Sequence, residues 1–232
     1  MKKLICIVLV AGCALAHAAK EPDAVDKAIE RGLEFLLAAQ KDNGSFTGQY
    51  GETVAIASLA GMSCLATGHV PGDAKYGKLI DRALERAVQY MHRHHHKEKG
   101  CFGYQNADQY PVTLSGAGIL CLELCGKHED PDSLRAAKYL MSVYRDKLPN
   151  EGYAYYGLYY ASQGLFQIGG ENWKEFSDWM YAEYLPRQRG SGAWPGHGSE
   201  QSEPNATAMT ILAFAVPYRQ LPVYQRDETV DE

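Results

Sequence analysis

Apolar and polar positions along the chain alternate between two kinds of helical segment. In the first kind, apolar residues such as Val25, Ile29 and Leu33 recur at helical spacing with charged residues between them, which is typical of an amphipathic surface helix. In the second kind charge is absent, as in residues 53–66 (TVAIASLAGMSCLA). Such a helix is expected to be buried on all sides. A turn containing Gly separates the two kinds, and the whole pattern occurs four times.

The repeats divide the chain into four helix pairs. Amphipathic helices are predicted over 23–37, 76–91, 131–144 and 173–184, and their apolar partners over 53–66, 114–125, 155–168 and 206–218. Asp130 and Pro131 form a capping sequence before the third amphipathic helix. Glu123 is the single charge within the second apolar helix. Internal repeats of this length indicate an array of helix hairpins.

This alternation predicts an all-α fold with apolar inner helices and amphipathic outer helices. The expected architecture is α/α toroid-like, with about four helix hairpins in an incomplete barrel or an arc. A simple four-helix bundle is the alternative, but eight alternating helices favour two layers. An open arc would expose a groove or promote self-association.

A short motif recurs in the turns of the first and fourth repeats. Gln precedes Gly by four positions and Gly precedes an aromatic residue by two, in Gln40, Gly44, Phe46 and again in Gln188, Gly192, Trp194. The motif resembles the Gln/Trp-type repeat of squalene-hopene cyclases and their prenyltransferase relatives, which belong to the terpenoid cyclase/protein prenyltransferase α/α toroid family. The resemblance covers residues 23–226, and in the second repeat His96 stands where Gln is expected. In that family the Gln and the aromatic residue tie neighbouring helix ends together.

The resemblance implies the catalytic or reactive motifs of the family, but this sequence does not contain them. The Asp-x-Asp-Asp acid of the cyclases, the Asp-x-Cys zinc motif of the prenyltransferases and the Gly-Cys-Gly-Glu-Gln thioester of the complement-type relatives are all absent. Glu52, directly before the first apolar helix, is the nearest counterpart of the cyclase acid and is the candidate catalytic residue. The alternative is that Glu52 only stabilises a helix N-terminus.

A histidine-rich segment is the candidate metal site. His92 and His96 lie four residues apart, on one face if the helix continues, and Cys101 follows. Imidazole and thiolate are ligands of divalent transition metals such as zinc. The alternative is a cationic helix C-terminus that complements the helix dipole.

A tyrosine-rich segment is the candidate ligand-binding surface. It comprises Tyr155, Tyr156, Tyr159 and Tyr160, with His197 in a later glycine-flanked turn. Aromatic faces bind cations and stack on sugar rings, but tyrosines also fill gaps between helices while their hydroxyls reach water.

The N-terminus predicts export. A basic start, an apolar run and a small-x-small site indicate a signal peptide over residues 1–18, which places the protein in the periplasm or outside the cell. A lipoprotein anchored through Cys13 is the alternative. The repeat domain then spans 19–226 and an acidic tail spans 227–232. An oxidising compartment permits disulfides, so the state of Cys64, Cys101, Cys121 and Cys125 stays open.

Charge and composition limit the classes of partner that the protein is expected to bind. A net charge of −5 argues against nucleic acid, and no segment after the leader is apolar enough to cross a membrane. The sequence favours a non-catalytic binding or scaffolding module of the cell envelope. The alternatives are a cyclase-like or prenyltransferase-like enzyme acting on an isoprenoid, and a carbohydrate binder or lyase. The expected partner is an apolar or carbohydrate ligand or another protein.

Overall fold

The computed structural model describes residues 23–49 and 51–220 in two units. The predicted signal peptide, the alternative anchor Cys13 and the acidic tail 227–232 lie outside these residues. The first unit contains helix α1 (Ala24–Ala39). Its start is fixed by Asp23, whose Oδ1 accepts hydrogen bonds from the backbone N of Val25 (2.8 Å) and of Asp26 (3.0 Å), as a helix-capping aspartate does.

The second unit begins at residue 40 and holds seven further α-helices. They are α2 (Val54–Ala66), α3 (Gly77–His94), α4 (Thr113–Leu124), α5 (Pro131–Lys147), α6 (Ala154–Ile168), α7 (Gly170–Tyr184) and α8 (Glu203–Ala215). A hairpin of two short strands, β1 (His95–His96) and β2 (Cys101–Phe102), follows α3. The all-α prediction is confirmed, with 65% helix, and the described chain forms no closed barrel.

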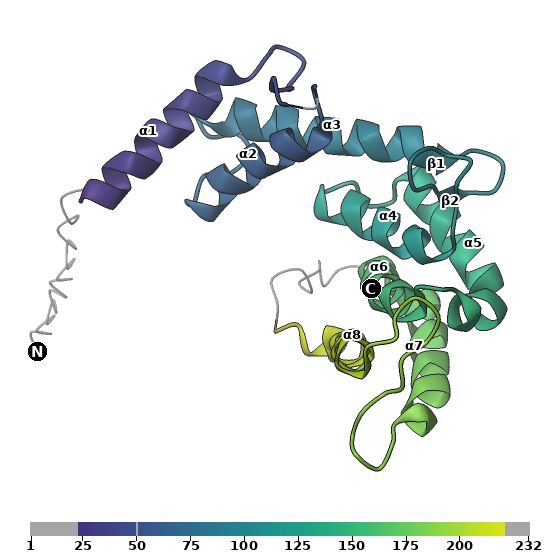
Figure 1. Ribbon diagram of the computed structural model, residues 1–232. Coiled ribbons are helices and arrows are strands. Elements are labelled where there is room, and N and C mark those ends of the chain that lie inside the picture. The colour runs from purple at the N-terminus through teal and green to yellow at the C-terminus, as the bar shows by residue number, and fades with distance from the viewer. Residues whose placement is uncertain (1–22, 50, 221–232) are drawn as a thin grey trace, which may run out of the picture. The chain divides into compact units, whose positions relative to one another are not determined.

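The apolar helices α4, α6 and α8 pack side by side, and the amphipathic helices α5 and α7 cover them (Figure 1). Helices α4 and α6 approach closely because Gly116 has no side chain. A Cβ built on Gly116 would lie 2.5 Å from the Cα of Ala161 on α6. Helix α2 packs mainly on α3.

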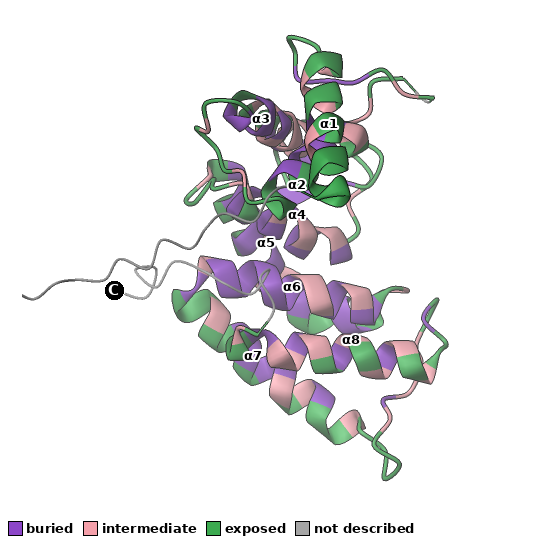
Figure 2. Cartoon of the chain, turned by 90° about the vertical axis from the view of Figure 1, so that its left-hand side faces the viewer, coloured by how far each residue is buried: buried purple, intermediate pink, exposed green. Residues whose placement is uncertain are grey.

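One expectation about burial is wrong. Helix α6 is buried along most of its length (Figure 2), but α2, which carries no charge, is not buried on all sides. Leu59, Met62 and Leu65 are 62%, 63% and 44% exposed. The reason is that α2 packs chiefly on α3 and not within the row of α4, α6 and α8. An apolar face of α2 therefore remains open.

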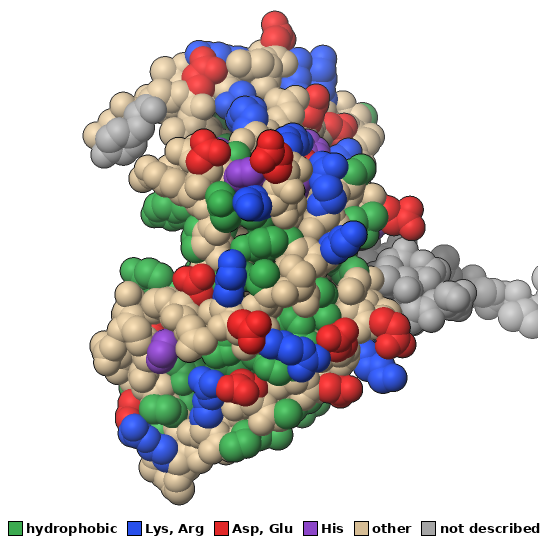
Figure 3. Space-filling view, turned by 90° about the vertical axis from the view of Figure 1, so that its right-hand side faces the viewer, with side chains coloured by type: hydrophobic (Ala, Val, Ile, Leu, Met, Phe, Trp, Pro, Cys, Tyr) green, Lys and Arg blue, Asp and Glu red, His purple; other side chains and the backbone are tan. Residues whose placement is uncertain are grey.

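The single charge in α4 has a structural explanation. Glu123 is buried, and its carboxylate accepts a hydrogen bond from Ser133 Oγ (3.0 Å) while lying 2.8 Å from His128 Nδ1. A buried carboxylate is tolerated when it is paired in this way. Glu123 therefore fastens α4 to the start of α5. On the molecular surface, in contrast, acidic and basic side chains are interspersed over the face shown in Figure 3.

Candidate functional site

The Gln and Gly residues of the repeat motif adopt the same geometry in both turns. Gln40 Nε2 donates to the carbonyl O of Gly44 (3.4 Å), and Gln188 Nε2 donates to that of Gly192 (2.9 Å). Both glycines have positive φ, 76° and 89°, which glycine adopts without strain. Gln40 also donates to the carbonyl O of Leu79 on α3 (3.2 Å). The motif therefore fixes turns, and in the first repeat it also fastens the turn to the next outer helix.

The aromatic residue and a basic residue complete each turn. Phe46 and Trp194 are each 4% exposed. The basic residue after Gln pairs with a carboxylate near the start of the following apolar helix: Lys41 with Glu52, and Arg189 with Glu203. The motif residues predicted from the sequence thus have structural roles in both repeats.

Glu52 lies within the turn of the first repeat. Its carboxylate is surrounded by hydrogen-bond donors and not by other carboxylates that would raise its pKa. Its carboxylate accepts hydrogen bonds from Lys41 Nζ (2.5 Å), Ser45 Oγ (2.7 Å) and Asn43 Nδ2 (3.3 Å). These donors, Lys41 first, lower the pKa of Glu52 to about 2. The group is therefore ionised near neutral pH, and the geometry suits a turn-closing carboxylate better than a proton donor.

The predicted tyrosines divide between the core and a half-buried cluster. Tyr155 is buried, and its hydroxyl donates to the carbonyl O of Pro195 (2.6 Å). Tyr156 and Tyr160 have ring centroids 4.6 Å apart, and Tyr159 and Tyr160 have centroids 4.9 Å apart. These three rings pack against one another, as aromatic side chains in helical interiors do.

His197 lies in a turn over the start of α6, where the key residue is Glu200. The backbone N of His197 donates to the carbonyl O of Glu200 (2.9 Å). The buried Glu200 carboxylate accepts from the backbone N of Tyr155 (2.7 Å) and of Tyr156 (3.0 Å). Glu200 caps α6 from a distant loop, a role that no local motif reveals. His197 is half-buried beside this cap.

The predicted metal residues are distributed differently from the expectation. His92 Nδ1 lies 2.8 Å from Asp132 Oδ2, and His92 Nε2 lies 3.6 Å from Asp130 Oδ2. In the described chain, the one group of three or more His, Cys, Asp or Glu ligand atoms within 4.8 Å of one another is His92, Asp130 and Asp132. His96 instead packs on Tyr110, with ring centroids 4.9 Å apart, and Cys101 is buried in β2. The structure does not bring His96 and Cys101 into a ligand group with His92.

Cations of the protein already occupy the Asp132 carboxylate. Lys97 Nζ lies 3.1 Å from Oδ2, and Arg135 bonds Oδ1. Burial raises the pKa of Asp132, but hydrogen bonds from His92, Lys97 and Arg135 outweigh it and lower this pKa to about 2. Burial lowers the pKa of neighbouring His95. A metal ion would have to displace Lys97, so the arrangement suits an ion-pair network that joins the end of α3 to the start of α5.

An apolar groove lies between α2 and α4, with α3 along its side. Its volume is about 390 Å³, within the roughly 300–1,000 Å³ typical of small-molecule sites. It is lined by Ser58, Gly61, Met62, Leu65, Ile80, Ala83, Leu84, Ala87, Ala117, Leu120, Cys121, Leu124, Cys125 and Tyr160. None of these residues carries a carboxylate, an ammonium or a guanidinium group. Of the predicted binding tyrosines, Tyr160 is among them.

Most residues of this groove were missed at the level of sequence. The available signal was the charge-free helix at 53–66, whose large apolar residues lie on every side of the helix. That pattern predicts burial and does not say that one face stays open. The opening depends on how α2 packs against α3, which periodicity does not encode.

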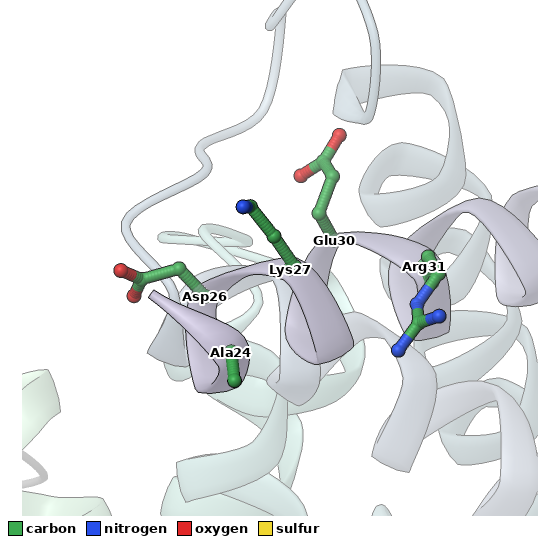
Figure 4. A pocket seen from close by; sticks show the side chains of 5 residues that line it. All are labelled: Ala24, Asp26, Lys27, Glu30 and Arg31. Carbon is green, nitrogen blue, oxygen red and sulfur yellow. The ribbon is translucent and has the colours of Figure 1, made fainter. Parts of the chain in front are cut away.

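A larger hollow of about 760 Å³ lies along α1 and is lined by Ala24, Asp26, Lys27, Glu30 and Arg31. These side chains all come from one helix and point in different directions, away from a common centre (Figure 4). Charges spread in this way along a helix are typical of a solvated face. The hollow therefore does not compete with the apolar groove as a candidate site.

Helices long and apolar enough to span a bilayer are absent from residues 23–49 and 51–220. No family model, curated protein or solved structure matches the chain.

Proposed function

We propose that the chain is a non-catalytic binding module built from helical repeats, and that its apolar groove binds the hydrocarbon part of a small apolar molecule. The observation that carries this proposal is the lining of the groove. Charged groups are absent from it, and its volume of about 390 Å³ suits one small ligand. Apolar surface left open in this way is a common sign of a binding site.

The shape of the groove also favours a flexible hydrocarbon. Met62 and Leu65 on α2 are partly exposed at the groove, and methionine adapts its unbranched side chain to irregular partners. Small residues, such as Gly61, Ala83 and Ala117, leave room between the helices. Burying each methylene of a ligand here would contribute about 0.8 kcal/mol.

The same observations weigh against the enzymatic alternative. An isoprenoid cyclase needs a protonated acid beside the apolar site. Glu52 has a pKa of about 2 and is hydrogen-bonded to Lys41, Asn43 and Ser45. Glu52 also does not line the groove. A carbohydrate would need polar groups around the aromatic rings, whereas Tyr160 faces an apolar lining.

The cell envelope is the proposed location of this module. The proposal rests on the N-terminal pattern of a basic start, an apolar run and the Ala16-His17-Ala18 site. An exported protein that binds an apolar molecule would hold it away from water between membranes or at a membrane surface.

Fluorescence titration with an uncharged polyene alcohol tests the proposal. We expect saturable binding of one probe per chain. Met62→Glu places a charge at the groove and should weaken binding about tenfold or more. Leu59→Glu is the matched control, because Leu59 is equally exposed on α2 but does not line the groove.

Three results would contradict the proposal. One is the absence of saturable binding to the wild type, and another is equal weakening by both variants. The third is a wild-type dimer that Met62→Glu dissociates, because the groove would then be an interface between two copies of the chain.

A further inference from the structure

Two cysteines lie one helical turn apart at the C-terminal end of α4, Cys121 within the helix and Cys125 at its C-cap. The backbone N of Cys125 donates to the carbonyl O of Cys121 (3.1 Å), which is the i, i+4 geometry of a helix. Both residues are free and half-buried, whereas Cys64 and Cys101 are fully buried.

The pair lies between two hollows of different character. Cys121 and Cys125 both line the apolar groove, together with the thioether residue Met62. Cys125 also lines a second hollow of about 500 Å³, whose polar lining includes Asp81, Glu85, Gln89 and Lys127. Both cysteines therefore border apolar residues, and Cys125 also borders a hollow with polar lining residues through which a cation could approach.

Cys121 and Cys125 are more accessible to a cation than the other two cysteines of the described chain, because Cys64 and Cys101 are fully buried. The interaction with Cys121 and the charge of Lys127 lower the pKa of Cys125 against the effect of burial, whereas the interaction with Cys125 and burial both raise the pKa of Cys121. Burial also raises the pKa of Cys64 and of Cys101. Thiolates are the form that binds metals, so Cys125 is the thiol that deprotonates more readily, and coordination of the metal must displace the proton of Cys121.

We propose that Cys121 and Cys125 form a binding site for copper(I). Both thiols lose their protons to solvent, two copper–sulfur bonds form, and copper keeps its oxidation state. The resulting complex carries one negative charge, and the Lys127 ammonium lies at the adjoining hollow to offset it. Thiolate and thioether ligands select copper(I) among common metals.

The ligand set favours copper(I) over zinc. Zinc in proteins takes four ligands in a closed structural site. Within the part of the chain that the structure describes, the group of three or more clustered His, Cys, Asp or Glu ligands is His92, Asp130 and Asp132, which excludes both cysteines. Copper(I) is satisfied by two sulfur ligands, and these two helix positions supply them. The site is independent of the proposed apolar ligand, because copper can reach Cys125 through the polar hollow.

Anaerobic titration of the full chain against a chromogenic copper(I) chelator tests this site. Every variant carries Cys6→Ser and Cys13→Ser, so that the leader contributes no thiol. We expect one copper(I) per chain to be retained against the chelator. Cys121→Ser and Cys125→Ser should each lose that copper, and Cys64→Ala should keep it.

Folding is checked by far-ultraviolet circular dichroism, and Cys121→Ala and Cys125→Ala serve as a second pair if a serine variant unfolds. The proposal is overturned if the Cys6→Ser, Cys13→Ser parent protein retains no copper or if a folded variant that also lacks Cys121 and Cys125 retains the same amount. It is also overturned if zinc binds the pair as tightly as copper(I). Polyene binding is measured on the same variants, so failure of the copper site is distinguishable from failure of the apolar groove.

Discussion

The close contact between α4 and α6 at Gly116 gives a sharp prediction for Gly116→Ala. The new methyl group would overlap the backbone of α6, lying 2.5 Å from both Ala161 Cα and the carbonyl C of Tyr160. Real Cβ contacts are not this short, so the two helices must separate. From the other side, a Cβ on Gly164 of α6 would lie 2.6 Å from the carbonyl O of Gly116. The two glycines therefore set the spacing of the apolar layer.

The expected loss of stability combines two opposing effects. Replacing Gly by Ala in a helix interior contributes about 1 kcal/mol of stability. Overpacking a close contact costs about 1–3 kcal/mol, and the upper end applies here because backbone atoms cannot rotate away. The net destabilisation is about 2 kcal/mol, which lowers the melting temperature by about 4–8 °C for a domain of this size.

Thermal unfolding followed by circular dichroism measures this effect, and two variants control it. Gly32→Ala on α1 has no heavy atom within 4 Å of the added Cβ and should not lower the melting temperature. Ala161→Gly should fail to rescue Gly116→Ala, because the overlap is with backbone atoms. A Gly116→Ala protein that melts at or above the wild-type temperature would refute the close approach of α4 and α6.

Three further predictions concern single polar groups. Glu200→Ala removes two hydrogen bonds to a buried charged group and should lower the free energy of unfolding in urea by about 3 kcal/mol. Glu203→Ala removes an exposed ion pair and should lower it by only about 0–1 kcal/mol. Equal losses of stability in the two variants would contradict the capping role of Glu200. Tyr184→Phe removes a buried hydroxyl without a hydrogen-bond partner in the described chain and should raise stability by roughly 1 kcal/mol, so a clear loss in urea unfolding would reveal a missing partner. Glu52 and Asp132 have pKa values lowered from 4.5 and 3.8 to about 2, so the stability that their ionised forms contribute is present above about pH 4.5 and is lost as pH falls toward 2. A Glu52→Gln, Asp132→Asn double variant should therefore lose less stability over that pH range than the wild type. An unchanged dependence of unfolding free energy on pH would contradict the two ionic clusters.

Helix periodicity in the sequence predicted the positions of the helices well. The charge-free segment at 155–168 becomes α6, which is buried along most of its length, and the Asp130-Pro131 cap begins α5 as expected. The turn motif of Gln40 and Gln188 also predicted a repeated geometry, because glycine with positive φ and a side-chain amide define the same turn twice. These features depend on neighbours along the chain, which a sequence displays directly.

The candidate site was harder to predict because it depends on contacts between distant segments. Glu200 caps a helix that begins 46 residues earlier in the sequence, and no local signal reports such a pairing. His92 finds Asp130 and Asp132 rather than His96, because the chain leaves the helix after His94 and enters β1. The open face of α2 follows from its packing on α3, which makes an apolar helix part of a groove.

Photocrosslinking with a diazirine-bearing prenyl alcohol, mapped by peptide mass spectrometry, tests the central claim most directly. We predict that the label falls on α2 and α4, within 54–66 and 113–124, and that Met62→Glu removes it while Leu59→Glu does not. Label spread over the amphipathic helices α5 and α7, or label unchanged in Met62→Glu, would contradict an apolar ligand site in the groove.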